Sequence, residues 1–169
     1  MFENFKEKLS VNAKKIIEEG YVVLEVENID RLNYFHDLFV SFLYKEFHLD
    51  IKELHNLHKS IKNYNLNDIR YGFFKYINSF EDITEQYLEL GKKSIFDIVG
   101  TELASNRTLN FSVQFPEDNS SLLPMHTDTF SGESEFQINL WVPLVNAYDT
   151  NSMFIFDPDF SKNILKDIG

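Results

Sequence analysis

Two side chains with metal-ligand chemistry lie two residues apart in the stretch LLPMHTDTFSGESEFQINLWVPL, residues 122–144. They are His126 and Asp128. In an extended strand, residues i and i+2 point to the same side, so the imidazole and the carboxylate can face one ion. Nitrogen and oxygen donors with open coordination positions suit ferrous iron, whose familiar site has two histidines and one carboxylate. The pair alone is weak evidence, because so short a motif arises readily by chance. A loop histidine beside an aspartate is the alternative.

The elements around this pair decide whether it can form a site. Residues 1 to about 104 have mainly helical periodicity, and residues from about 105 to 169 are aromatic, β-branched and rich in turns. Alternation of apolar and polar residues in the second part predicts strands at 109–115, 136–144 and 152–158. Short strands separated by turns are typical of a jelly-roll. We therefore predict one α+β domain over residues 1–169, with a helical N-terminal half packed on a partial double-stranded β-helix of antiparallel strands.

Apolar residues spaced three and four apart predict several helices in the first part. The expected helices cover the opening residues to about Gly20, including Phe2 and Phe5, then Asp30 to His48, and then residues 84–104 with Thr84 as the N-cap. Two further segments are not expected to be helical. YVVLEV, residues 21–26, predicts a short strand, and NYNLNDIR, residues 63–70, predicts a loop.

Composition excludes several classes of protein. The chain has 169 residues, 43% of them hydrophobic and 17 of them Phe, which indicates a folded domain. A net charge of −11 argues against a nucleic-acid partner, since such proteins need a concentrated basic face. The absence of Cys removes thiolate ligands and disulfides and favours the cytoplasm. We expect neither a signal peptide nor a membrane partner, because no apolar run approaches about 18 residues.

A strand, a turn, H-x-D, a glycine-containing loop and LWVPL follow one another in order between residues 109 and 158. This order resembles the Fe(II)/2-oxoglutarate-dependent oxygenases found sporadically in bacterial carbohydrate and surface-polysaccharide gene clusters, within the phytanoyl-CoA-dioxygenase-like group. The similarity covers about residues 65–158. It implies a dioxygenase that hydroxylates a sugar or a sugar-derived intermediate in surface carbohydrate biosynthesis, with Fe(II) as metal and 2-oxoglutarate as co-substrate.

The resemblance also implies roles for individual residues. His126 and Asp128 match the two metal ligands of the H-x-D motif. Trp141 resembles the aromatic residue that lines the 2-oxoglutarate pocket, and a core tryptophan is the alternative. Gln114, on the strand before the motif, can face the barrel interior and touch the co-substrate, with a solvent-facing glutamine as the alternative. Asn139 can face the site in the same way.

The chain departs from the family pattern after H-x-D. Such enzymes resemble one another in a second histidine, the third ligand, and in an arginine that pairs with the 5-carboxylate of 2-oxoglutarate. This sequence has no His after residue 126 and no Arg after residue 107. Lys162 and Lys166 are poor substitutes, because lysine lacks the planar pair of donors that arginine offers a carboxylate. We therefore expect a C-terminally shortened family member whose open sheet edges favour self-association or a complementing chain.

Other functions stay open. The chain can be a non-catalytic or degenerate fragment that acts as a binding module, or a cupin-like sugar isomerase or epimerase that needs no 2-oxoglutarate. His55 and His58 are one helical turn apart, which is a spacing that two zinc ligands can have. Their spacing departs from the zinc-protease motif, so a surface helix is favoured. For Arg70 and Arg107 we expect local ion pairs.

Overall fold

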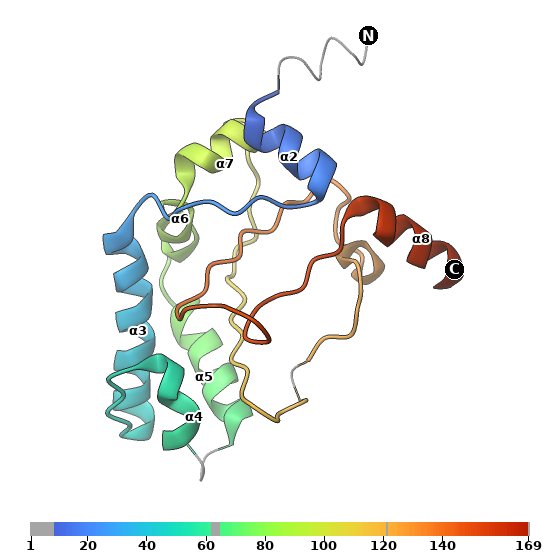
Figure 1. Ribbon diagram of the computed structural model, residues 1–169. Helices are drawn as coiled ribbons and strands as arrows, with labels where there is room; N and C mark the ends of the chain where they lie inside the picture. Colours follow the sequence, from blue (N-terminus) through green and yellow to red (C-terminus); the bar gives the residue numbers. More distant parts are fainter. Residues whose placement is uncertain (1–8, 62–64, 121, 169) are drawn as a thin grey trace. The chain divides into compact units, whose positions relative to one another are not determined.

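The computed structural model of the chain, drawn in Figure 1, describes residues 9–61, 65–120 and 122–168. It is 48% helical. The predicted positions Phe2 and Phe5 lie outside the described residues. In chain order, the described helices and 3-10 turns are α2 (Val11–Glu19), α3 (Ile29–Phe47), η1 (Leu54–Asn56), α4 (Leu57–Ser60), α5 (Leu66–Ile77), α6 (Ile83–Leu88), α7 (Lys92–Val99), η2 (Asp128–Ser131) and α8 (Pro158–Ile168).

The predicted α+β jelly-roll fold is wrong. The described residues contain no β-strand and therefore no sheet, so the partial double-stranded β-helix is not formed. Residues 21–26, 136–144 and 152–157 have irregular backbone instead. A strand needs a neighbouring strand for its backbone hydrogen bonds, and β-propensity depends strongly on that context. Alternation of apolar and polar residues predicts which side chains are buried. It does not show whether a second strand lies beside the segment to form the backbone hydrogen bonds of a sheet.

The segment 109–115 illustrates this difference. Its burial alternates as predicted, with Val113 only 9% exposed and Gln114 exposed. Its backbone is hydrogen-bonded to helix side chains rather than to another strand. The Asn78 side chain accepts from the N–H of Leu109 at 2.8 Å and donates to its carbonyl at 3.0 Å. Arg70 donates to the carbonyl of Val113. Side chains of α5 and of its C-cap residue therefore take the place of the hydrogen bonds that a neighbouring strand would provide.

Tertiary contacts divide the chain into two compact units. Unit 1 comprises Met1–Tyr34, Asp82–Arg107 and Ala147–Gly169, and unit 2 comprises Phe35–Glu81 and Thr108–Asn146. Each unit thus combines segments that are distant in sequence. The prediction of a single domain over the whole chain stays a prediction.

The core of unit 2 is aromatic and lies between α3, α5 and the segment 109–115. The Phe73 ring is fully buried, and its centroid lies 4.7 Å from that of Phe39 and 4.5 Å from that of Phe111. Tilted and edge-to-face pairs at such distances add to the stabilisation that burial of the rings provides. A Cβ at Gly72 would lie 2.9 Å from the Phe42 ring, so glycine lets this ring pack against α5. This core fixes where α5 and the segment 109–115 lie.

In unit 1, α2 and α7 contact each other, as Figure 1 shows. The carboxylate of Glu27 holds the start of α7 by accepting from the backbone N–H groups of Lys93 and Ser94 at 3.0 and 2.8 Å. It also accepts from the Ser94 hydroxyl at 2.6 Å. The Ser94 hydroxyl is the largest cause of the lowered pKa of Glu27, and the two backbone N–H groups add to it. Acidic groups at a helix start satisfy N–H groups that have no partner within the helix.

The helix predictions succeeded where apolar periodicity was strong. The helix expected from Asp30 to His48 is confirmed, because α3 spans Ile29–Phe47. The loop expected at residues 63–70 is wrong in part, because the Asn65 side chain caps α5 at its start and the helix already includes residue 66. The helix expected over 84–104 is wrong in part: it is divided near Gly91 into α6 and α7, its N-cap is Asp82 rather than Thr84, and α7 already ends at Val99. In the described part of the chain, no helix is long and apolar enough to cross a membrane.

Candidate functional site

His126 and Asp128 lie in unit 2, at a tight turn rather than on the expected strand. Residues before Asp128 are irregular, and the 3-10 turn η2 begins at Asp128 itself. Gly132 ends the turn with φ of +87°, a left-handed conformation that favours glycine. The predicted glycine loop after H-x-D is thus present, although the predicted strands beside it are not.

The two side chains face each other across a short gap. Nε2 of His126 lies 3.4 Å from Oδ1 of Asp128. Nδ1 of His126 lies 2.7 Å from the carbonyl oxygen of Pro124, and because a carbonyl can only accept, Nδ1 carries the proton. In the neutral imidazole, the Nε2 lone pair then faces the carboxylate. Two ligands bound at about 2.1 Å to one metal, at angles of about 90–110°, stand roughly 3.0–3.4 Å apart. The observed separation fits a shared ion.

Asn139 contacts the pair directly. Its Nδ2 donates to Oδ2 of Asp128, and its Oδ1 accepts from Nε2 of Gln137 at 2.9 Å. The predicted contact of Asn139 with the co-substrate stays a prediction, and the structure shows this amide on the carboxylate of Asp128. It holds Oδ2 and leaves Oδ1 toward His126. Hydrogen-bond partners of this kind orient metal ligands and tune their basicity.

The pair offers two donor groups of the kind that a metal site uses, and not a complete set. Imidazole nitrogen and carboxylate oxygen have the right chemistry for ferrous iron, so these residues fit the metal. Within the described ranges, however, no group of three or more His, Cys, Asp or Glu side chains could hold an ion. The third ligand was expected to be missing, and that stays a prediction, whereas the double-stranded β-helix predicted around the pair is wrong.

Trp141 and Gln114 do not join the pair. Trp141 is 50% exposed, so the core alternative does not describe it, and Gln114 is exposed on the outer side of the segment 109–115. In the part of the chain that the structure describes, neither has a hydrogen bond or ring contact to His126 or Asp128. The solvent-facing alternative describes Gln114.

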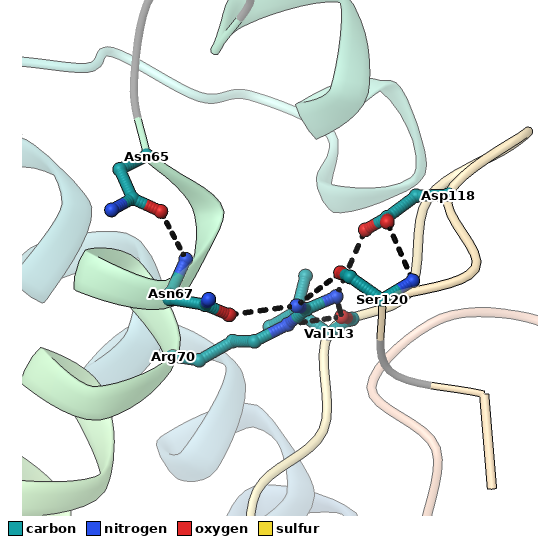
Figure 2. Close-up of polar contacts among 6 residues, drawn as sticks. All are labelled: Asn65, Asn67, Arg70, Val113, Asp118 and Ser120. Carbon is teal, nitrogen blue, oxygen red and sulfur yellow. Dashed lines mark hydrogen bonds and ion pairs between the residues drawn. The ribbon is translucent and has the colours of Figure 1, made fainter.

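A second polar centre in unit 2 surrounds Arg70 (Figure 2). Its Nε and Nη2 donate to the carbonyl of Val113 at 2.8 and 2.5 Å, and Nη2 also contacts Asp118 at 3.2 Å. Its Nη1 donates to Asn67 and Ser120, both at 3.1 Å. A guanidinium has five N–H donors, and these bonds use all five. Arg70 does form an ion pair, but with a carboxylate 48 residues away rather than with the local one predicted, and no ion pair of Arg107 occurs among the described residues.

Asp118 is held as an ionised group in this centre. The pKa of its carboxyl is lowered, first by the Ser120 hydroxyl, then by the Ser120 backbone N–H, which donates at 2.8 Å, and by Arg70. The turn that carries Asp118 was predicted from PEDNSS, residues 116–121, but its contact with α5 was not. No local signal in the sequence pairs an arginine with a turn 48 residues away.

A cavity of about 460 Å³ lies beside this centre. Its lining comes from α4, the start of α5 and the turn at 116–120, and its polar members are His58, Asn65, Asn67, Asp118 and Ser120. His58 therefore lies in a cavity rather than in a zinc site, and its ring centroid is 6.3 Å from that of Phe115. His55 instead contacts Glu53. The cavity was not predicted, because its residues belong to three separate segments.

Comparison of the chain with protein families, with curated proteins and with solved structures gives no match.

Proposed function

We propose that the chain carries two metal ligands of an Fe(II)- and 2-oxoglutarate-dependent oxygenase that hydroxylates a sugar or a sugar-derived intermediate. The observation that carries the proposal is the approach of His126 Nε2 to Asp128 Oδ1 at 3.4 Å, with Nδ1 held by the Pro124 carbonyl. The order of H-x-D, the glycine-containing loop and LWVPL in the sequence supports the choice of family and of a carbohydrate substrate. The absence of Cys supports a cytoplasmic setting.

A second histidine–carboxylate pair in unit 2 provides the contrast that makes His126 and Asp128 distinctive. Nε2 of His55 also lies 3.4 Å from a carboxylate oxygen, that of Glu53. There, however, the Asn56 amide lies 2.8 Å from the same carboxylate oxygen and 3.0 Å from the same ring nitrogen. These lone pairs therefore already have a donor. At His126 the neighbouring amide, Asn139, contacts the outer carboxylate oxygen and leaves the gap open.

Each residue of the site has a separate role in this proposal. His126 and Asp128 occupy two positions around the metal and leave the others open for co-substrate and water. Asn139 keeps Oδ1 of Asp128 turned toward His126, and the Pro124 carbonyl keeps the imidazole in the tautomer that binds through Nε2. When bound, ferrous iron with 2-oxoglutarate and O₂ supplies decarboxylation to succinate and CO₂, coupled to transfer of one oxygen atom into a substrate C–H bond.

Iron titration of the full chain under anaerobic conditions tests the proposal. We expect binding with one ion per chain, and loss of at least about tenfold in affinity in His126→Ala and in Asp128→Ala. His55→Ala is the matched control, because it removes a histidine with the same distance to a carboxylate. Equal affinity of wild type and His126→Ala, or equal losses in His126→Ala and His55→Ala, would contradict the site. Succinate release from 2-oxoglutarate with candidate sugars then tests the activity.

A second candidate is a non-catalytic interaction module, supported by the many exposed apolar side chains between residues 122 and 160. Leu123 is 77% exposed, Phe136 86% and Phe154 73%. Exposed apolar side chains in such number commonly mark surfaces that another protein covers. In this case we expect no specific iron binding, together with association of copies or with a complementing chain. Sedimentation across a range of protein concentrations measures that association.

A further inference from the structure

The cavity beside Arg70 offers hydrogen-bonding groups that the fold does not use. Asn67 Oδ1 accepts from Arg70 and Asn65 Oδ1 accepts from the backbone N–H of Asn67. The amide NH₂ groups of both residues have no partner among the described residues. The Ser120 hydroxyl accepts from Arg70 and donates to Asp118, so the fold already uses it. Asp118 accepts from Arg70 and from Ser120, and a carboxylate has about four acceptor sites, so acceptor capacity remains.

Charge argues for a neutral ligand. An anion would meet the ionised Asp118 carboxylate, and Arg70, the cation paired with it, already uses its five N–H donors within the protein. A cation would compete with Arg70, which lies 3.2 Å from Asp118. The cavity therefore presents donors and acceptors together without a net charge that selects either sign.

Apolar groups complete the lining. Phe115 and Ile61 belong to it, and Ile61 is only 3% exposed. The ring of His58 lies edge-on to Phe115. A volume of about 460 Å³ falls in the range of small-molecule sites, about 300–1,000 Å³. Such sites combine apolar walls with a few polar groups that fix orientation.

We infer that this cavity binds a small neutral ligand that carries neighbouring hydroxyl groups on an apolar frame, as a pyranose sugar does. Vicinal hydroxyls donate to Asp118 and accept from the Asn65 and Asn67 amides, and the C–H face of the ring packs on Phe115. The Arg70 network fixes Asn67, Asp118 and Ser120 before the ligand arrives, which lowers the entropic cost of binding. The site consists of residues other than His126 and Asp128 and does not rest on the proposed oxygenase function.

Nuclear magnetic resonance of the ¹⁵N-labelled full chain tests this inference without iron. The probes are the methyl glycosides of glucose, galactose, mannose and N-acetylglucosamine, each titrated into the millimolar range. 2-Oxoglutarate is the anionic probe and spermidine the cationic one. We expect at least one glycoside to shift the side-chain amide signals of Asn65 and Asn67 in a saturable way. His58→Ala should weaken that binding about fivefold, since it removes one polar and one ring contact.

Matched variants keep the test decisive. His55→Ala, on the neighbouring turn and outside the cavity, should leave the glycoside affinity unchanged, and far-UV circular dichroism checks that both variants fold. Ser120→Ala provides a second lining variant and should also weaken binding. The inference is overturned if no glycoside shifts these signals, if 2-oxoglutarate or spermidine binds there more tightly than every glycoside, or if His55→Ala weakens binding as much as His58→Ala. Because iron is absent, failure here is distinguishable from failure of the iron site.

Discussion

Replacing Arg70 by lysine should destabilise unit 2 although the charge is kept. Arg70 is only 14% exposed and donates five hydrogen bonds from three nitrogens. Lysine has three donors on one nitrogen, so it cannot reach both the Val113 carbonyl and the groups beyond it. Leaving the carbonyl of a buried residue without its donors costs about 1–3 kcal/mol. With the weaker bonds to Asn67 and Ser120 also lost, we expect a total of about 2–3 kcal/mol.

Urea unfolding followed by far-UV circular dichroism measures this loss. With an m-value of about 2 kcal/mol/M, the midpoint in Arg70→Lys should fall by roughly 1 M or more. Arg107→Lys is the matched control, because Arg107 is exposed and should change the unfolding free energy by no more than about 0.5 kcal/mol. If both variants unfold at the urea concentration of the wild type, Arg70 does not hold the segment 109–115 and the account of this segment is refuted.

Three further variants probe the core, the turn and the proposed metal site. Gly72→Ala should lower the unfolding free energy by about 1 kcal/mol in urea melts, because crowding of Phe42 outweighs the better helix propensity of alanine. Hydrogen bonds from Ser120 lower the pKa of Asp118, so the ionised group stabilises the fold above about pH 4 and this stabilisation is lost as pH falls through the lowered pKa. The stability difference between wild type and Asp118→Asn should therefore shrink on acidification. Asn139→Ala should weaken iron binding about tenfold in the anaerobic titration.

Each of these variants has a control in the same chain. Gly91→Ala introduces a Cβ that meets nothing within 4 Å, and a loss equal to that of Gly72→Ala would contradict the crowding argument. Asp50→Asn replaces an exposed carboxylate and should show no such change with pH. Asn110→Ala replaces an exposed amide of unit 2 and should leave iron affinity unchanged. An unchanged affinity in Asn139→Ala would mean that the amide does not orient Asp128.

Local sequence patterns predicted many of the helices. They predicted few of the hydrogen bonds that join segments distant in sequence. The helical face in α3 is strong enough that its bounds follow from the sequence to within about a residue. The start of α5 was missed because Asn and Asp favour loops as well as caps, and Asn65 acts as a cap here. The segment 109–115 has the burial of a strand without its hydrogen bonds, because Asn78 and Arg70 satisfy the backbone from positions that no local pattern connects.

The same distinction separates the predicted site from the observed one. The spacing of His126 and Asp128 was enough to bring their side chains together, although a turn and not a strand does it. Trp141 and Gln114 depended on a sheet to carry them to the pair, and among the described residues no hydrogen bond or ring contact joins them to it. Asn139 reaches Asp128 across the turn at Gly132, so its contact survives the loss of the predicted fold.

In the proposed oxygenase, the groups available to bind the metal differ from those available to bind the co-substrate. The chain has three arginines. Arg70 is used by the fold, the Arg31 guanidinium lies over the Tyr34 ring at 5.6 Å, and Arg107 is exposed in unit 1. Within the described part of unit 2, which holds His126 and Asp128, the arginine is Arg70, and the fold uses it. We therefore expect binding of a dicarboxylate to depend on exposed cations, whose attraction salt screens. Titrating 2-oxoglutarate into the iron-loaded chain at low and at physiological ionic strength tests whether the co-substrate is bound mainly by exposed cations. Affinity that falls steeply with salt, while iron affinity does not, is the expected result, and tight salt-insensitive binding would show that the co-substrate has an anchor of its own.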